Sequence, residues 1–352
     1  MDNTVIIEAI DKAIKHKARF YAYRLPGEQQ LHFGAQIIDQ RTPEGFMIVP
    51  FVEKPDCMPY FISAQFDAEK YLKLPVSSLP VTSLHKVDEV STTREAYMES
   101  AARCIDALRG GGLRKVVLSR VIVDETAPSL TWTGVFEQLL DRCPDAFVFV
   151  FNSEATGAWM GASPERYLSY DGHRLRTMAL AGTRLAGTPG EWGEKEKEEQ
   201  AIVADYIEGK FADLKMEYER TPTFTRVAGN VEHLCTEFTG TVTRPSQVDG
   251  MRNTLHPTPA LGGLPVKAAV KMIGEVEEHS RRYYGGYMGP VESDGQFELF
   301  VNVRSLEFDG ERYCIYVGGG LTAGSDAAQE WEETCGKAVL LQGVLGNVQE
   351  TA

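Results

Sequence analysis

The segment that decides the fold is YYGGYMGPVESDGQFELFVNVRSLEFDGERYCIYVGGG, which spans residues 283–320. Its β-branched and aromatic residues predict three strands, at 283–292, 296–308 and 312–320. Short turn sequences rich in Asp and Gly separate these strands, as in an antiparallel meander. Hairpin turns of this kind, interleaved with helices elsewhere and without regular strand–helix–strand spacing, predict an α+β fold.

Helices are predicted on both sides of this segment. The run at 93–112 has its apolar residues on one helical face and ends in three glycines, and either Thr92 or Thr93 would cap its first turn. The other elements that the pattern predicts clearly are a buried strand at 114–123, a long helix within 190–218 and a last helix that begins near Asp326.

Composition excludes several classes of protein. The 352 residues are 43% hydrophobic and 24% charged, which is ordinary for a globular chain. There is no apolar run long enough to span a membrane and no secretion signal, so we expect a cytoplasmic protein without membrane partners. Six scattered cysteines without a CxxC pair argue against a disulfide framework and against zinc.

The chain is acidic, with a formal net charge of −14. No basic patch stands out, which argues against a nucleic-acid partner. An anionic substrate would therefore need local help from arginine, lysine or a metal ion.

The domain organisation is predicted to be simple. No repeat, composition break or flexible linker divides the chain, so we expect one domain over residues 1–352. Residues 1–90 contain strand-like runs and proline-rich turns but no assignable motif, and we expect them to complete the same fold. The recognisable motifs lie in residues 92–350, the expected catalytic core.

Two helices carry glutamates with the same unusual spacing. Glu330 and Glu333, with Lys337 after them, lie on one ridge of the last helix, and that ridge continues into apolar residues. Glu196 and Glu199 repeat the spacing on the helix within 190–218. Charged runs of this kind are usually solvated surface. The alternative is that both pairs face inward and form an oxygen-rich site, which would suit Mg²⁺.

Other polar or flexible residues also allow two interpretations. Lys115 opens an apolar strand, so it either extends to solvent from the strand end or acts as a base in a cleft. Arg304, among apolar neighbours, either forms a structural ion pair or binds a substrate carboxylate. The glycines of YVGGGLTAG and LAGT either form turns or let backbone approach a ligand. Neither glycine run has a nucleotide-binding pattern.

Nine motifs in order now identify a family resemblance. They are RKVVLSR, GASPERYL, LAGTR, EKEKEEQAIV, HPTPALGG, RRYYGGYMG, NVRS, YVGGGL and EWEETCGK. This series, from about Thr92 to the C-terminus, resembles the chorismate-utilising enzymes, such as isochorismate synthase, salicylate synthase and anthranilate synthase component I. The resemblance implies a single α+β domain in which two large antiparallel sheets pack together, with helices outside and the site in a cleft.

Within this family the resemblance is strongest to the isochorismate synthases. Lys115 stands where enzymes that add water to chorismate have lysine, and Glu165 of GASPE stands where the family has its general acid. Ala181 occupies a position that is typically lysine in aminodeoxychorismate synthases. The segment HPTPALGG is also similar to the isochorismate synthase version. The resemblance therefore implies a Mg²⁺-dependent enzyme that makes isochorismate from chorismate, for menaquinone or siderophore synthesis.

The resemblance also implies roles for individual residues. Lys115 would deprotonate the water that attacks C2, and Glu165 would protonate the departing C4 hydroxyl. Mg²⁺ would be held directly by Glu199 and Glu333, and through water by Glu196 and Glu330. The residues expected to contact the substrate are Gly182, Thr183, Ala260, Leu261, Tyr284, Arg304, Gly319, Gly320 and Lys337.

Two positions depart from the family pattern, and three alternatives stay open. Glu199 is followed by Gln200 where the family usually has histidine, and the family's GAGI is GGGL here; both read as conservative variation. The alternatives are a salicylate synthase, another chorismate enzyme such as anthranilate synthase, and a catalytically silent binding protein. We expect a monomer without a glutaminase subunit.

Overall fold

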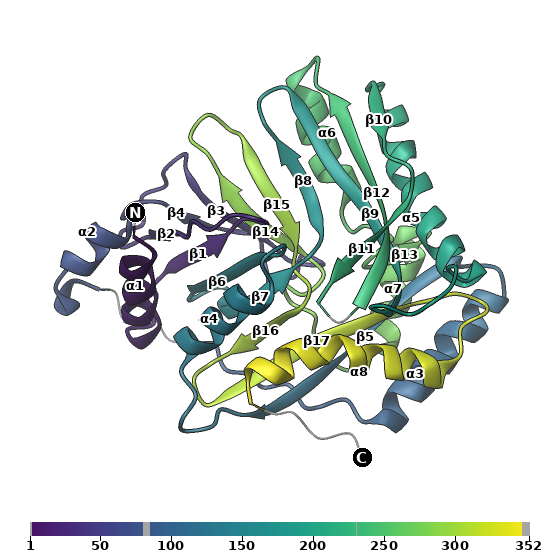
Figure 1. Ribbon diagram of the computed structural model, residues 1–352, viewed down its shortest axis with the longest axis horizontal. Helices are drawn as coiled ribbons and strands as arrows, with labels where there is room; N and C mark the ends of the chain where they lie inside the picture. The colour runs from purple at the N-terminus through teal and green to yellow at the C-terminus, as the bar shows by residue number, and fades with distance from the viewer. Residues whose placement is uncertain (1, 80–84, 230, 347–352) are drawn as a thin grey trace.

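The computed structural model describes residues 2–79, 85–229 and 231–346 (Figure 1). It has eight α-helices and a short 3₁₀ helix in the described residues. They are α1 (Asn3–Lys15), α2 (Ala68–Lys73), η1 (Val76–Ser78), α3 (Arg94–Arg109), α4 (Trp132–Arg142), α5 (Glu194–Asp213), α6 (Pro245–Leu255), α7 (Val266–Val276) and α8 (Ala327–Val344).

The strands form two sheets, and every strand pair in the described ranges is antiparallel. The first sheet has the order β13 (Gly263–Leu264), β5 (Lys115–Glu125), β17 (Arg312–Leu321), β16 (Ser305–Phe308), β7 (Gly157–Ser163), β6 (Phe147–Ser153), β1 (Phe20–Arg24), β2 (His32–Ala35). The second has the order β10 (Tyr218–Arg220), β12 (Val231–Thr241), β9 (Arg174–Leu185), β8 (Arg166–Tyr170), β15 (Phe297–Val301), β14 (Tyr287–Val291), β3 (Gly45–Val49), β4 (Tyr60–Ser63), with β11 (Phe224–Ala228) beside β12. The predicted α+β fold with two antiparallel sheets is confirmed.

The predicted three-stranded meander is wrong in one respect. Residues 296–308 do not form one strand, because β15 pairs with β14 and β8 in the second sheet, whereas β16 pairs with β17 and β7 in the first. The chain crosses between the sheets at residues 302–304, where Arg304 adopts a left-handed φ of 51°. The two predicted hairpins therefore exist, but they belong to different sheets.

The core between the sheets is aromatic. Along β6, Phe147, Phe149 and Phe151 face the second sheet, while the valines between them face outward. Phe147 stacks on Phe300 of β15 with ring centroids 4.2 Å apart. Figure 1 shows α1 and α4 on the outer face of the first sheet and α5 and α6 over the second. Helices, two sheets and helices thus form four layers.

The first 90 residues contribute strands to both sheets. β1 and β2 extend the first sheet beyond β6, and β3 and β4 extend the second beyond β14. Residues 230 and 347–352, which belong to the expected domain of 1–352, lie outside the described residues. Among the described helices, none is sufficiently long and apolar to cross a membrane.

Side-chain caps explain where α3 and α8 begin. The Thr93 hydroxyl accepts a hydrogen bond from the Ala96 N–H at 3.2 Å, so Thr93 and not Thr92 caps α3. The Asp326 carboxylate accepts from the N–H groups of Ala328 and Gln329 at 3.0 Å, which confirms the predicted start of α8.

Candidate active site

One cleft gathers most of the predicted site residues. It lies where β5 and β17 of the first sheet approach β9 and β12 of the second, beside α5 and α8. The predicted residues that line it are Glu165, Gly182, Thr183, Glu199, Ala260, Leu261, Tyr284, Arg304, Gly319, Gly320 and Lys337. The other four, Lys115, Glu196, Glu330 and Glu333, lie at its edge, and their contacts are described below.

Glycines of β17 leave the space that the carboxylates occupy. A Cβ atom on Gly320 would overlap the Oε1 atom of Glu199, and one on Gly319 would lie 3.2 Å from the Oε2 atom of Glu330. Both glycines are inside β17 and not in a turn, since each pairs with β5. They allow helices α5 and α8 to bring charged side chains against the sheet.

Gly182 has a different reason to be glycine. It has a left-handed φ of 71°. It is also the extra residue of a bulge in β9, because Ala181 pairs with Leu234 of β12 and Thr183 pairs with the preceding residue, His233. A Cβ atom there would lie 2.9 Å from the backbone oxygen of Glu196. The bulge thus brings the first turn of α5 close to the cleft.

Lys115 is fully buried, so the interpretation in which it extends to solvent is wrong. Its side chain is 1% exposed, and its Nζ atom lies 2.9 Å from the Oε1 atom of Glu199. Glu199 in turn is 13% exposed and does not belong to the solvated face of α5. The buried strand and the charged helix therefore meet through one ion pair across the sheet–helix interface.

Two further lysine–glutamate pairs surround this one. The Nζ atom of Lys337 donates to Glu333 Oε1 at 2.7 Å and to the Gly318 carbonyl at 2.9 Å. The Nζ atom of Lys195 donates to Glu330 Oε1 at 2.6 Å. Lys195 was not among the predicted site residues. Its side chain is 31% exposed, the largest exposed fraction in the three pairs, and that of Glu333 follows at 23%.

Glu196 is placed differently from the other three glutamates. Its Oε2 atom lies against Gly193, the N-cap residue of its own helix. Within residues 2–79, 85–229 and 231–346, no ion pair joins its carboxylate to a lysine or arginine. Glu196 therefore does not share the lysine pairing of the other three glutamates.

The cleft drives two carboxyl groups toward opposite charge states. Burial raises the pKa of Glu165 to about 8, against the opposing effect of the Lys115 and Lys337 ammonium groups. Burial also acts to raise the pKa of Glu199, but Lys115, followed by Lys337 and Lys195, holds that pKa below its ordinary value. At neutral pH Glu165 is therefore a proton donor, whereas Glu199 is an anion.

Glu330 is the most buried of the glutamates in the cluster. Burial and the neighbouring Glu333 raise its pKa, and the ammonium of Lys195 opposes that rise. Its Oε2 atom is buried and has no hydrogen-bond partner among the described residues. An orphaned carboxylate oxygen in a cluster of acids is the kind of atom that a cation would satisfy.

Arg304 is buried at the crossing between the sheets. No carboxylate in the described part of the chain forms an ion pair with it, so the structural ion-pair interpretation finds no support. Its Nη2 atom lies 3.3 Å from the Nε2 atom of His233. Because a buried guanidinium needs an anion, its position in the cleft favours binding of a substrate carboxylate.

His233 is a site residue that sequence reasoning missed. Its Nδ1 atom lies 3.1 Å from the Gly182 carbonyl, which only accepts, so Nδ1 carries the proton and Nε2 accepts from Arg304. Burial first, and then Arg304 and Lys337, place the pKa of His233 well below its usual range. The signal was a polar side chain in the buried run VEHLC of β12.

The walls of the cleft are held by buried contacts behind them. Arg281 donates to the carbonyl of Leu261 at 2.8 Å and to that of Val117 at 2.6 Å, and Glu277 pairs with its guanidinium. Tyr284 stacks on Tyr316 with centroids 5.5 Å apart. Burial raises the pKa of Tyr284 to about 12, so its hydroxyl stays a hydrogen-bond donor.

Gln200 replaces the family's usual histidine but faces away from the carboxylate cluster. Its amide nitrogen donates to the Ala179 carbonyl and to the Thr236 hydroxyl, both at 3.1 Å. The side chain thus ties α5 to β9 and β12. The substitution affects how the helix is held on the sheet.

The carboxylate cluster suits Mg²⁺ by its chemistry. Its donors are carboxylate oxygens, which a hard cation prefers, and the Glu330 Oε2 atom lacks a partner. No group of three or more His, Cys, Asp or Glu in the described ranges has converged on one point, however. Glu199, Glu330 and Glu333 instead each contact a lysine ammonium. The residue types fit the metal, and cation binding would rearrange these pairs.

Comparisons with known proteins agree with the fold and the motifs. A family model described as "Chorismate binding enzyme" matches residues 46–346. The isochorismate synthase EntC of Escherichia coli strain K12 is 27% identical over 325 residues, which are 89% of this chain and 80% of that protein.

Solved structures share the fold across nearly the whole chain. The menaquinone-specific isochorismate synthase MenF of Escherichia coli superposes with a TM-score of 0.78 at 21% identity, covering 96% of this chain and 91% of that one. Anthranilate synthase component I of Streptococcus pneumoniae gives a TM-score of 0.67 at 17% identity, covering 93% and 92%.

Proposed function

The chain belongs to the family of chorismate-binding enzymes, and from that premise we propose that it is a Mg²⁺-dependent isochorismate synthase. The observation that carries the proposal is the burial of the Glu165 carboxyl and of the Lys115 side chain at one cleft. Burial raises the pKa of Glu165 to about 8, so its carboxyl holds a proton at neutral pH. Replacing one hydroxyl by another on a ring requires such an acid and such a base.

The reaction is an isomerisation in which water is added and water is lost. Lys115 first loses the proton that it carries in the ion pair with Glu199, and its neutral Nζ then accepts a proton from the water whose oxygen bonds to C2 of chorismate. The ring double bonds shift, and the bond from C4 to its hydroxyl breaks. Glu165 gives its proton to that hydroxyl, which leaves as water, so the product has the same atoms as the substrate. The low dielectric of the buried site keeps the proton on Glu165 until that step.

The substrate's two carboxylates have separate partners in this proposal. Arg304, oriented by His233, and the Tyr284 hydroxyl bind the enolpyruvyl carboxylate. Glu199 and Glu333, with Glu196 and Glu330 through water, are the residues that would hold Mg²⁺, which when bound neutralises the ring carboxylate. Lys337, beside Glu333 and Gly318, adds positive charge to the same end of the cleft.

A product assay tests the proposal. Purified protein is incubated with chorismate in the presence of Mg²⁺ or of EDTA, and the products are identified by chromatography and mass spectrometry. We expect isochorismate only with Mg²⁺, and none from the Lys115→Ala variant. Equal isochorismate formation with EDTA would refute the metal requirement alone.

Other products would assign the chain to a neighbouring activity. Salicylate with pyruvate would identify a salicylate synthase, and anthranilate formed with ammonia an anthranilate synthase. Bound chorismate without turnover would indicate a silent binding protein. The proposal includes a monomeric cytoplasmic enzyme that acts without a glutaminase subunit and supplies menaquinone or siderophore synthesis.

A further inference from the structure

Lys195 connects the two glutamate-bearing helices. It lies in the first turn of α5, and its ammonium reaches Glu330 on α8, with 2.6 Å between Nζ and Oε1. The carboxylate of Glu330 is 1% exposed, while the side chain of Lys195 is 31% exposed. One end of this ion pair is therefore in the core, and the other is reached by solvent.

The three ion pairs of the cluster differ in how easily they can open. Lys115 is 1% exposed and Lys337 is 14% exposed, so neither ammonium has ready access to water. Lys195 alone of the three combines a flexible four-carbon chain with access to solvent. Its ammonium can leave Glu330 and become hydrated at little cost, whereas the glutamate cannot follow it.

We propose that Lys195 is the resident counter-ion of the carboxylate cluster and that a divalent cation must displace its ammonium from Glu330 in order to bind. This exchange presupposes the proposed Mg²⁺ site. A buried carboxylate beside Glu333 is costly unless it is paired. The lysine supplies that pairing until the metal does, so binding exchanges one cation for another and lowers the net affinity for Mg²⁺.

The experiment compares two lysine-to-methionine variants. Lys195→Met removes the proposed competitor, and Lys197→Met is the matched control. Lys197 lies two residues further along α5 and pairs with Glu194 on the surface, with side chains 48% and 92% exposed. Binding of MgCl₂ to the EDTA-treated, substrate-free protein is measured by isothermal titration calorimetry at pH 8.5.

We expect Lys195→Met to bind Mg²⁺ about five- to tenfold more tightly than the wild type, which corresponds to the loss of one competing ion pair. Lys197→Met should match the wild type. In EDTA the Lys195→Met protein should melt at a lower temperature, and Mg²⁺ should raise its melting temperature more than that of the wild type. Equal or weaker Mg²⁺ binding by Lys195→Met would overturn the proposal.

A second measurement needs no variant. The wild-type protein is labelled briefly with an amine-reactive acetylating reagent, with and without Mg²⁺, and each lysine is quantified by mass spectrometry. Labelling of Lys195 should rise several-fold with Mg²⁺ while that of Lys197 stays constant. Unchanged labelling of Lys195 in protein that demonstrably binds Mg²⁺ refutes the exchange alone. No Mg²⁺ binding by wild type and variants refutes the metal site as well.

Discussion

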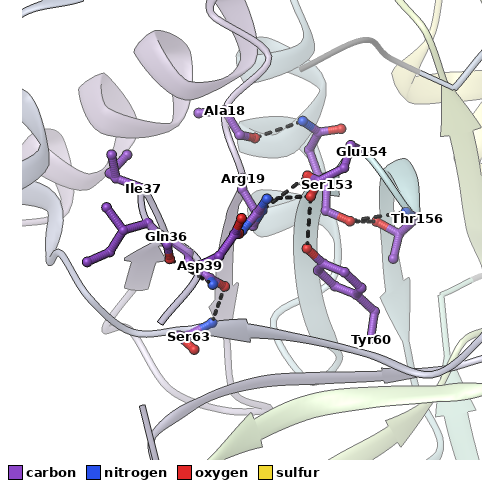
Figure 2. Close-up of polar contacts among 12 residues, drawn as sticks. Ala18, Arg19, Gln36, Ile37, Asp39, Tyr60, Ser63, Ser153, Glu154 and Thr156 are labelled. Atoms are coloured by element: carbon purple, nitrogen blue, oxygen red, sulfur yellow. Dashed lines mark hydrogen bonds and ion pairs between the residues drawn. The ribbon is translucent and has the colours of Figure 1, made fainter. Parts of the chain in front are cut away.

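Two polar clusters lie at opposite ends of β7, and they are built on different rules. Figure 2 shows the first, in which Arg19 donates to Asp39 at 2.7 Å and also pairs with Glu154, which accepts from the Tyr60 hydroxyl. It lies next to the start of β7, and Glu165 follows the other end, so roughly 20 Å of strand separates them. In the Arg19 cluster each charged group has an ion-pair partner within the protein.

The cleft at the other end leaves buried polar groups without protein partners in the described ranges. In the part of the chain that the structure describes, neither Glu165 nor Arg304 forms an ion pair, and Glu330 Oε2 has no hydrogen-bond partner. Such groups reduce stability, because burial is costly for each of them. The Arg19 cluster therefore stabilises the packing of the two sheets. The cleft lowers the stability of the fold and keeps polar groups available to bind a ligand.

Glu165→Gln should produce the largest loss of activity, because it removes the proposed proton donor of the cleft. We expect kcat to fall by about 10²–10⁴-fold, since a neutral amide cannot give up the proton that the leaving hydroxyl needs. Turnover of chorismate is measured at saturating substrate, with circular dichroism as the control for folding. A variant that retains more than a tenth of the activity would exclude Glu165 as the acid.

Gly320→Ala should come next, because it alters the cleft without changing any charge. Its new methyl group would overlap Glu199 Oε1, so the Glu199–Lys115 pair must shift. We expect a loss of about 10²-fold in kcat/KM, typical of a catalytic group misplaced by about 1 Å. Gly324→Ala is the control, since a Cβ atom there meets nothing within 4 Å. Equal activity of both variants would contradict this account of β17.

The free energy of unfolding should depend on pH through the buried Glu165 carboxyl. Because the folded-state pKa of Glu165, about 8, lies above the ordinary 4.5, the folded protein holds this proton more tightly than the unfolded chain. The contribution is present in full below pH 4.5 and is lost as the pH rises toward 8. Near pH 9, Glu165→Gln should therefore unfold with a free energy up to about 5 kcal/mol higher than the wild type, since each pKa unit corresponds to about 1.4 kcal/mol.

The same carboxyl predicts a pH limit on activity. As Glu165 ionises, kcat/KM should decline above about pH 8. Urea unfolding at pH 5 and pH 9 tests the stability difference, and a pH–rate profile tests the limit. Identical unfolding curves of wild type and variant at pH 9 would show that Glu165 is not held neutral by burial.

Arg19→Met should have the smallest effect, and only on stability. Its partners are partly solvated, with the Asp39 and Glu154 side chains 89% and 37% exposed, so they regain water when the arginine is lost. We expect the free energy of unfolding to fall by about 1 kcal/mol and kcat to stay unchanged. A loss of activity without loss of stability would mean that the two clusters are coupled along β7.

Elements whose causes are local could be predicted from the sequence. The apolar faces of α3 and α8, the cap of α8, the buried strand β5 and both hairpin turns follow from residues a few positions apart, whereas the choice between Thr92 and Thr93 as the cap of α3 did not. The order of the nine motifs was sufficient for the family resemblance. The spacing of Glu330 and Glu333 also placed both on one ridge of α8.

How these elements meet could not be predicted from local sequence. Several contacts depend on partners far away in the chain. They include the ion pairs of Lys115 with Glu199 and of Lys195 with Glu330. The division of the run 296–308 between two sheets has the same cause. A β-strand pattern reports which side of a strand is apolar, but not which strand lies beside it. His233 is a site residue because the β9 bulge and the Arg304 crossing converge on it. Local spacing cannot encode such contacts, since they form only when both sheets are packed.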